Sequence, residues 1–339
     1  MPSETTEYSF RLATAADRPA IVAFMNTHWE SRHPLINLPE LFDFYYNAPG
    51  GRLNFAMAEQ NGHFAALAGY IPASGDEQPD IWVSLWVAAR QATGSGLELM
   101  AALPALTGCK TLACNNIRPK TRAFYEFLGF TTGQMGHFYR LAPRAEYRVA
   151  RPARRQILPV QGEAALVAYP TKEALLQSGF VPPQANPYKD FGYITRRYYA
   201  YPHQTYSVYG AMLPGQAAPF GLLVTRTVPV LGTFVLRIAD YIGPPALLPC
   251  LGSAINRLLQ AENAEYIDLY CAGLSAELLA QTGFTHRTAE DQSILPNYLT
   301  PPLFENTEYY YFTNRPENFT MFKADGDQDR PNLPLPPEE

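Results

Sequence analysis

A repeat inside the chain limits its fold more than any other feature of the sequence. Leu128-Gly129-Phe130 in the first half is matched by Thr282-Gly283-Phe284 in the second half, at an offset of 154 residues. The same offset lays the apolar stretch at residues 79–88 on residues 233–242, and it aligns the helix-forming segments that follow them. One Gly-Phe match could arise by chance, but three elements in one register indicate two copies of one fold.

The length of the chain agrees with two copies. The chain has 339 residues, of which 47% are hydrophobic and 17% are charged, which suits two domains of about 150 residues each. Residues 143–159 are rich in proline and arginine and mark the boundary. We therefore predict a first domain at residues 1–142, a linker at 143–159, a second domain at 160–330 and a disordered tail at 331–339.

Apolar periodicity and turn signals predict a mixed α/β fold for the first domain. Thr14 is the expected N-cap of the first helix. Asn61-Gly62 is a strong signal for a hairpin between two strands. The predicted strands are residues 8–13, 54–59, 63–71, 80–88, 110–115 and 136–141, and the predicted helices are residues 15–28, 97–106 and 120–127.

The second half repeats part of this order. The predicted strands are residues 205–213, 219–227, 233–241 and 266–271, and the predicted helices are residues 247–260 and 275–281. Residues 322–332 form a polar run with three aspartates, which we interpret either as a solvated tail or as a functional segment. The run lacks the spacing of a calcium-binding loop.

The composition excludes several classes of function. A formal net charge of −5 gives no electrostatic reason to bind nucleic acid or an anionic membrane. No apolar stretch approaches the roughly 20 residues needed to cross a bilayer, and residues 1–10 do not resemble a signal peptide. The four cysteines show no metal-ligand spacing, so we expect no metal site and free thiols in a reducing cytoplasm.

One stretch of the first domain is suited to binding phosphate. Residues 91–96 (QATGSG) lie between an apolar strand and a helix. Glycines allow a tight turn whose N–H groups point into one concavity, and the start of the helix adds partial positive charge. Arg90 and Lys110 could add further positive charge. A second motif follows, in which Phe124-Tyr125 precedes Leu128-Gly129-Phe130.

The two motifs together resemble the GNAT superfamily of acyl-CoA N-acyltransferases over residues 7–141. The resemblance implies that coenzyme A lies along the strand at residues 80–88, near the backbone of Leu85 and Val87. It implies that the turn holds the pyrophosphate, with Asn116 as a further contact. Arg118 stands where the family often has asparagine. The turn residues expected to bind the cofactor are Gln91, Thr93, Gly94, Ser95 and Gly96.

The same resemblance gives Tyr125 the role of protonating the departing thiolate, and it makes Tyr125 a further contact of the cofactor. A phenol with an ordinary pKa near 10 can donate a proton to a thiolate as it leaves. A buried core tyrosine is the structural alternative. The attacking amine must also lose a proton, and Asp80, His33 and His137 are the candidate bases of the first domain.

The second copy has lost the phosphate turn. At the offset of 154 residues, the QATGSG turn falls on residues 245–250 (PALLPC), where two prolines replace the glycines and remove N–H donors. We therefore expect a degenerate GNAT-like domain that does not bind coenzyme A. This domain would serve as a substrate platform or as a structural wall.

Residues 189–209, rich in tyrosine and arginine, and residues 237–243 resemble tandem-GNAT proteins of bacterial surface-polysaccharide synthesis. Some of these acylate the amine of a nucleotide-linked amino-deoxysugar. The resemblance implies that Trp86, Arg197, Arg237 and Asp240 bind such an acceptor. Asp240 is otherwise expected to form a salt bridge, for example with Arg237, because an unpaired buried charge is unfavourable.

The sequence leaves three functions open. The first is acylation of a nucleotide-linked aminosugar, and the second is acylation of another small amine. The third is a non-catalytic protein that binds acyl-CoA. A homodimer is also left open.

Overall fold

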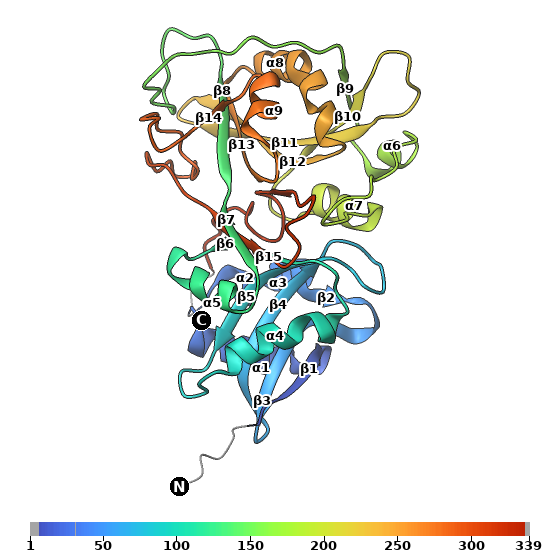
Figure 1. Cartoon of the computed structure of the whole chain (residues 1–339), viewed down its shortest axis with the longest axis vertical. Helices are drawn as coiled ribbons and strands as arrows, with labels where there is room; N and C mark the ends of the chain where they lie inside the picture. The colour runs from blue at the N-terminus through green and yellow to red at the C-terminus, as the bar shows by residue number, and fades with distance from the viewer. Residues whose placement is uncertain (1–6, 31, 336–339) are drawn as a thin grey trace. The chain divides into compact units, whose positions relative to one another are not determined.

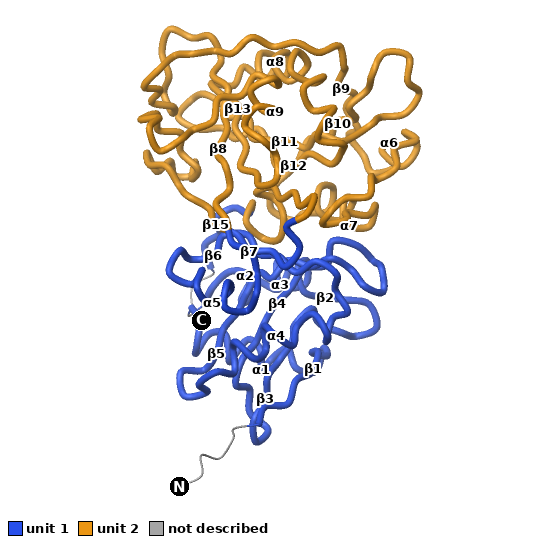
Figure 2. The backbone as a smooth tube through the Cα atoms, in the orientation of Figure 1, with its two compact units in different colours: residues 1–132, 311–316, 330–339 blue, residues 133–310, 317–329 orange. Residues whose placement is uncertain are grey.

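The protein is described by a computed structural model of residues 7–30 and 32–335. The chain divides into two compact units (Figure 2). Unit 1 comprises residues 1–132, 311–316 and 330–339, and unit 2 comprises residues 133–310 and 317–329. Within the described residues, each unit contains one eight-stranded mixed sheet, which confirms the predicted mixed α/β fold.

The elements of unit 1 follow the predicted order, with additional short helices that the sequence patterns did not indicate (Figure 1). The helices are α1 (Arg18–His28), α2 (Pro34–Asn37), α3 (Pro39–Tyr46), α4 (Ser95–Thr107) and α5 (Arg122–Phe127). The strands are β1 (Ser9–Thr14), β2 (Asn47–Ala48), β3 (Arg52–Gln60), β4 (His63–Pro72), β5 (Ile81–Ala88), β6 (Leu112–Ile117), β7 (Thr131–Gln134) and β15 (Tyr310–Thr313). Short 3-10 turns lie at Ala15–Asp17, Pro49–Gly51 and Pro119–Thr121.

The hairpin predicted at Asn61-Gly62 joins β3 to β4. Both residues have positive φ, 51° and 77°, as the favoured two-residue hairpin turn requires. The apolar residues of α3 pack on the adjoining strands, where the Phe42 and Phe55 rings stack with centroids 5.9 Å apart. The predicted hairpin is therefore confirmed.

Unit 2 also has the elements that the repeat predicts. Its helices are α6 (Lys172–Leu176), α7 (Phe191–Tyr199), α8 (Gly252–Ala261) and α9 (Ala276–Gln281), with a 3-10 segment at Pro245–Leu251 before α8. Its strands are β8 (Gly136–Leu141), β9 (Ala165–Ala168), β10 (Ser207–Met212), β11 (Gly221–Val230), β12 (Thr233–Ile242), β13 (Ala264–Ala272), β14 (Thr285–His286) and β16 (Met321–Phe322). The helix expected at residues 247–260 becomes α-helical only from Gly252, because Pro249 cannot donate an N–H bond inside a helix.

The repeat holds at the level of strand register. Ile81 pairs with Leu112 in parallel, and their counterparts at the offset of 154 residues, Val235 and Tyr266, pair in the same way. The bounds of α5 and α9 also differ by this offset. Each helix is followed by a glycine with positive φ, 83° at Gly129 and 98° at Gly283. The two units are therefore two copies of one fold.

The two copies exchange one strand. The first sheet has the order β1-β3-β4-β5-β6-β15-β7, and the second has the corresponding order β9-β10-β11-β12-β13-β8-β14. The strand β8 follows β7 directly in sequence, yet it belongs to the second sheet, where it pairs with β13. The strand β15 follows the second copy and completes the first sheet. The strand expected at residues 136–141 exists, but it does not belong to the first domain.

The sheet of unit 2 has one apolar face and one polar face. On β13, Ile267 and Leu269 pack with α8 and α9 in the main apolar core. The alternating residues Asp268 and Tyr270 point to the opposite face, because side chains alternate along a strand. This opposite face carries charged residues that are buried in the unit.

Candidate functional site

The candidate site in unit 1 begins where β5 and β6 separate. These parallel strands pair only at Ile81–Leu112 and Trp82–Ala113. From Val83 to Ala88, β5 remains paired with β4 in antiparallel orientation. Over the same residues, β5 no longer pairs with β6. The backbone groups of β5 that point toward β6 are therefore available for a ligand along the second half of the strand.

A glycine turn follows β5 directly and starts α4. Gly94 is the N-cap residue and has φ of 87°, a conformation that side chains disfavour. Gln91, Thr93 and Gly94 are exposed. The first N–H groups of a helix have no intrahelical partners, and the helix dipole favours an anion there. The glycine turn therefore places an exposed helix start shortly after β5.

Ser95 has a different role from the other turn residues. It is fully buried, and its hydroxyl lies 2.8 Å from the carbonyl oxygen of Ala92 and 3.2 Å from that of Ala65. Its backbone N–H also donates to Ala92. The N–H of Ser95 thus closes the turn, and its hydroxyl also joins the turn to β4, so a ligand at the turn would contact the neighbouring residues and not these two donors.

Gly96 ties the turn to the aromatic residues of the site. Its carbonyl accepts a hydrogen bond of 3.0 Å from Nε1 of Trp86 on β5. A Cβ atom at Gly96 would lie 3.2 Å from Cβ of Ala88 and 3.3 Å from Nε1 of Trp86. Glycine at this position therefore allows α4 to start close against β5.

Tyr125 on α5 lies in an aromatic stack. Its ring centroid is 5.5 Å from that of Trp86 and 4.3 Å from that of Phe312, which also stacks on Phe130. The structure thus brings together Gly96 and Tyr125, expected at the cofactor, and Trp86, expected at the acceptor. Sequence reasoning missed Phe312, since β15 lies far along the chain and no local signal links it to α5.

The environment of Tyr125 changes its expected chemistry. The side chain is buried, and burial raises the pKa of its phenol well above the ordinary value of 10. A thiol has an ordinary pKa of about 8.5, so full proton transfer from Tyr125 to a thiolate would be uphill. A neutral phenol that donates a hydrogen bond fits this environment better.

The structure places the three candidate bases elsewhere. Asp80 precedes β5, at the opposite end from the turn, and accepts a hydrogen bond of 2.8 Å from the Thr111 N–H. His33 caps α2 by accepting from the Leu35 N–H, and burial together with the charge of Arg330 lowers its pKa to about 4. His137 lies on β8, in the sheet of unit 2.

His137 belongs to a buried charge network. Its Nε2 lies 3.0 Å from Asp268, and its Nδ1 accepts a hydrogen bond from Arg287. Arginine cannot accept a hydrogen bond, so the imidazole is neutral and donates from Nε2 to the carboxylate. Burial and the nearby arginines lower the pKa of His137 in agreement with this assignment.

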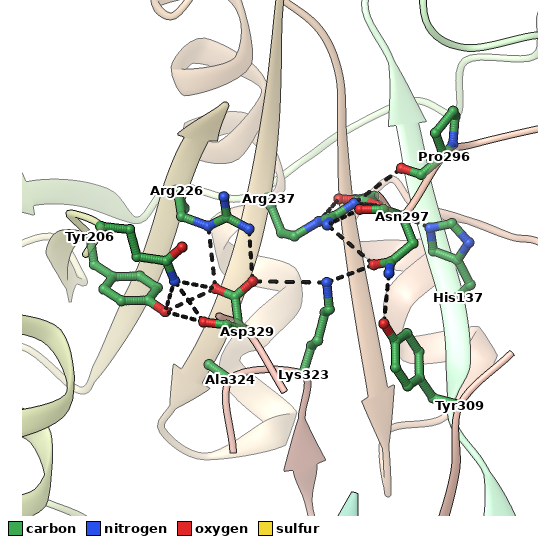
Figure 3. Close-up of polar contacts among 12 residues, drawn as sticks. His137, Tyr206, Arg226, Arg237, Pro296, Asn297, Tyr309, Lys323, Ala324 and Asp329 are labelled. Carbon is green, nitrogen blue, oxygen red and sulfur yellow. Dashed lines mark hydrogen bonds and ion pairs between the residues drawn. The ribbon is translucent and has the colours of Figure 1, made fainter. Parts of the chain in front are cut away.

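Three residues expected to bind the acceptor, Arg197, Arg237 and Asp240, are also buried in unit 2. Arg237 (Figure 3) forms a two-pronged ion pair with Asp268, with both N–O distances 2.9 Å. Arg197 donates to the carbonyl groups of Ala324 and Asp329. Asp240 forms a salt bridge with Lys189, with an N–O distance of 2.7 Å. A salt bridge was one of the two predictions for Asp240, although the partner suggested there was Arg237.

The polar run at residues 322–332 is not a solvated tail. Asp325, Asp327 and Asp329 are buried in unit 2, and Asp329 pairs with Arg226 at 2.8 Å. Of the tail predicted at 331–339, residues 331–335 are described without regular structure, and 336–339 lie outside the described residues. Asn116, expected to contact the cofactor, is exposed near the end of β6 with φ of 65°.

Two further findings concern metal ions and membranes. Among the described residues, no group of histidine, cysteine, aspartate and glutamate side chains is arranged to hold a metal ion. None of the helices that the structure describes is long and apolar enough to span a membrane.

The fold is similar to that of acyltransferases of known structure. A GCN5-related N-acetyltransferase from Anabaena variabilis ATCC 29413 matches with a TM-score of 0.51 at 10% identity, over 91% of this chain and 72% of the other. A probable N-acyltransferase from Enterococcus faecalis V583 matches with a TM-score of 0.50 at 9% identity, over the same shares. No protein-family model matches the chain, and none of the curated proteins is similar to it in sequence. At these identities the likenesses show a shared fold over most of the chain.

Proposed function

We propose that this chain is an acyl-CoA-dependent N-acyltransferase and that unit 1 binds the acyl-CoA. The observation that carries the proposal is the separation of β5 from β6, followed directly by the glycine turn and the start of α4. A ligand with amide groups and a diphosphate suits this arrangement, because backbone groups line the opening and N–H groups lie at its end.

Three parts of unit 1 would hold acyl-CoA, which supplies an acyl group activated as a thioester. The backbone of Leu85 and Val87 would bind the pantetheine amides, and the exposed turn residues Gln91, Thr93 and Gly94 would surround the pyrophosphate. Asn116 is a further proposed contact. Holding thioester and amine side by side provides much of the acceleration in such a reaction.

Tyr125 has the catalytic role in this proposal. The amine attacks the thioester carbonyl and releases its proton to solvent, the carbon–sulfur bond breaks, and negative charge develops on the departing sulfur. A neutral Tyr125 would stabilise that charge by donating a hydrogen bond. Trp86 packs against Tyr125 and would fix the direction of the phenol. We assign no base, because Asp80, His33 and His137 are engaged in the contacts described above.

Unit 2 does not carry the same site. The counterpart of Tyr125 at the offset of 154 residues is Leu279, and the counterpart of the turn contains Pro245 and Pro249. The second copy has therefore lost both the donor side chain and the phosphate turn. We propose that only unit 1 is catalytic.

We propose that the acceptor is the amine of a nucleotide-linked amino-deoxysugar and that the reaction serves surface-polysaccharide synthesis. The support for this acceptor is the sequence resemblance alone, since Arg197, Arg237 and Asp240 are buried in hydrogen bonds and ion pairs. We also propose a cytoplasmic location, which four cysteines without disulfides support.

A thiol-release assay tests the proposed reaction. The purified chain would be incubated with acetyl-CoA or hydroxybutyryl-CoA and a panel of UDP- and dTDP-linked aminosugars, with simple amines and amino acids as alternatives. Release only with an aminosugar nucleotide would support the acceptor that we propose. Release with a simple amine would contradict that acceptor but support the acyltransferase, and binding of coenzyme A with no release anywhere would contradict catalysis.

A further inference from the structure

Unit 2 contains an opening in its sheet like the one in unit 1. The parallel strands β12 and β13 pair from Phe234–Ala264 to Arg237–Asp268. Beyond these residues the two strands continue to Ile242 and Ala272 without pairing with each other. The second copy has therefore kept the separation of its central strands although it has lost the phosphate turn.

A segment near the end of the chain occupies this opening. We name residues 319–329 the strap. Its short strand β16 pairs with Cys271 and Ala272 of β13. The next two N–H groups bond to both sides of the opening, from Lys323 to the Tyr270 carbonyl at 3.2 Å and from Ala324 to the Ala239 carbonyl at 3.3 Å. The strap thus satisfies backbone groups on β12 and on β13.

The two carbonyl groups that accept these hydrogen bonds belong to residues whose counterparts in unit 1 are proposed to contact the cofactor. At the offset of 154 residues, Ala239 corresponds to Leu85 and Tyr270 corresponds to Asn116. Both Leu85 and Asn116 are proposed contacts of coenzyme A. The strap therefore lies in unit 2 at the place where the proposed function puts the pantetheine arm in unit 1, and this comparison rests on that function. Pantetheine and a peptide both carry amide N–H groups, so one type of opening suits both.

Side chains fix the strap in the opening. Phe322 packs in the apolar core beside the sheet. Nζ of Lys189 lies 2.6 Å from Asp325 of the strap and 2.7 Å from Asp240 of β12. Tyr198 also donates a hydrogen bond of 2.5 Å to Asp240. One buried lysine thus joins the strap to the strand beside it.

The chain around the opening is shaped for a peptide. Gly273, directly after β13, has φ of 85°, and a Cβ atom there would lie 1.8 Å from the carbonyl oxygen of Phe319. No side chain fits between these backbones, so glycine permits the close approach. At the other end of the strap, Asp329 accepts hydrogen bonds from Arg226 and Tyr206 (Figure 3).

We propose that the opening in unit 2 is a peptide-binding groove whose ligand is the strap of the same chain. Strand addition supplies main-chain hydrogen bonds, and buried side chains supply specificity, as in other proteins that bind extended peptides. The second copy of the fold has exchanged a coenzyme for a segment of its own polypeptide.

Cleavage of the folded chain before the strap tests this proposal. Pro316, Glu317 and Asn318 are exposed, so a specific protease site placed there can be cut in the intact protein. We expect the C-terminal fragment to remain bound at one copy per chain during gel filtration. A labelled peptide of residues 317–335, added in excess, should then replace the fragment.

Two peptide variants make the test specific, and they leave the protein unchanged. Ala324→Pro removes the N–H group that bonds to Ala239, and we expect it to compete at least ten-fold less well than the native peptide. Asn332→Pro lies outside the strap at an exposed position and should compete like the native peptide.

Several outcomes would overturn the proposal. Loss of the fragment on cleavage would show that the opening does not hold the strap as a ligand. If the Ala324→Pro and Asn332→Pro peptides competed equally well, the backbone hydrogen bond to Ala239 would have no role in binding. If the native peptide did not replace the fragment, the segment would not be a separable ligand. Displacement by acetyl-CoA would make the opening a cofactor site. Failure of unit 1 to bind coenzyme A would contradict only the proposed function, because retention of the fragment is measured without it.

Discussion

At the scale of single residues, Gly94 provides the most direct test of the phosphate turn. Its positive φ means that valine would strain the turn by about 1–2 kcal/mol, and the side chain would also block approach to the N–H groups. We expect Gly94→Val to weaken binding of coenzyme A at least ten-fold in calorimetry. Gly62→Val is the matched control, since Gly62 also has positive φ and lies in a hairpin. An equal loss of affinity in both variants would contradict the assignment.

Tyr125→Phe tests the proposed hydrogen bond to the leaving sulfur. We expect kcat to fall about 10²-fold, the effect typical of removing one such donor, while the Kd of coenzyme A stays the same. Because burial raises the pKa of Tyr125, the phenol stays protonated and donating below pH 10. The wild-type profile of kcat should therefore show no alkaline loss caused by Tyr125 up to pH about 9.5. A loss in that range that disappears in the phenylalanine variant would contradict this view.

Glu98 is an acidic residue beside the proposed phosphate site. Its Oε1 lies 3.6 Å from the position that a Cβ atom of Gly94 would take. A carboxylate there repels a pyrophosphate, so Glu98→Gln should bind coenzyme A about two- to five-fold more tightly at low ionic strength. Salt near 1 M shortens the screening length to about 3 Å and should remove the difference. Tighter binding that persists in high salt would point to another cause.

At the scale of elements, the polar face of the second sheet depends on the pair between Arg237 on β12 and Asp268 on β13. Both side chains are buried. Asp268→Asn would leave the guanidinium without its carboxylate, so we expect a loss of about 3–5 kcal/mol in the free energy of unfolding. Asp17→Asn is the control, because its partner Arg11 is partly exposed and such pairs contribute about 0–1 kcal/mol. Urea unfolding measures both, and equal losses would contradict the prediction.

The same pair predicts how stability depends on pH. The charge of Arg237 and hydrogen bonds lower the pKa of Asp268 below its ordinary value of 3.8, although burial opposes them. A carboxyl with a lowered pKa in the folded state stabilises the fold above the ordinary value and loses that contribution as the pH falls below it. Between pH 7 and pH 3, wild type should therefore lose more stability than Asp268→Asn. If the free energies of unfolding of wild type and Asp268→Asn fell in parallel over this pH range, Asp268 would not titrate in this way.

At the scale of the whole molecule, strand exchange makes each unit depend on the other half of the sequence. A fragment of residues 1–142 contains β8, which belongs to the second sheet, and lacks β15, which lies between β6 and β7. Unpaired strand edges favour aggregation. We expect this fragment to show no cooperative unfolding transition by circular dichroism. A chain of residues 7–134 joined by a flexible linker to residues 309–316 should show one, and similar behaviour of the two polypeptides would contradict the exchange.

Local patterns in the sequence were sufficient for much of the fold and for the glycine turn between β5 and α4. Asn61-Gly62 predicted its hairpin because the φ values that it favours are those of the turn. The glycines of residues 94 and 96 predicted a close strand-to-helix turn, and the repeat predicted the second copy. These signals depend on neighbours within a few residues, or on a comparison of the sequence with itself, so no tertiary information was needed.

Only the tertiary structure decided which segments lie together across long stretches of sequence. The strand at residues 136–141 was predicted correctly as a strand but joins the second sheet, since pairing is chosen by free strand edges and not by sequence order. Phe312 reaches Tyr125 for the same reason. The aspartates of the strap look like those of a solvated tail until Lys189 and Arg226 are seen beside them. Burial and charge pairing are properties of the folded chain, so they changed the roles first expected for Tyr125 and His137. For Asp240 they favour the salt bridge, one of the two alternatives that the sequence left open.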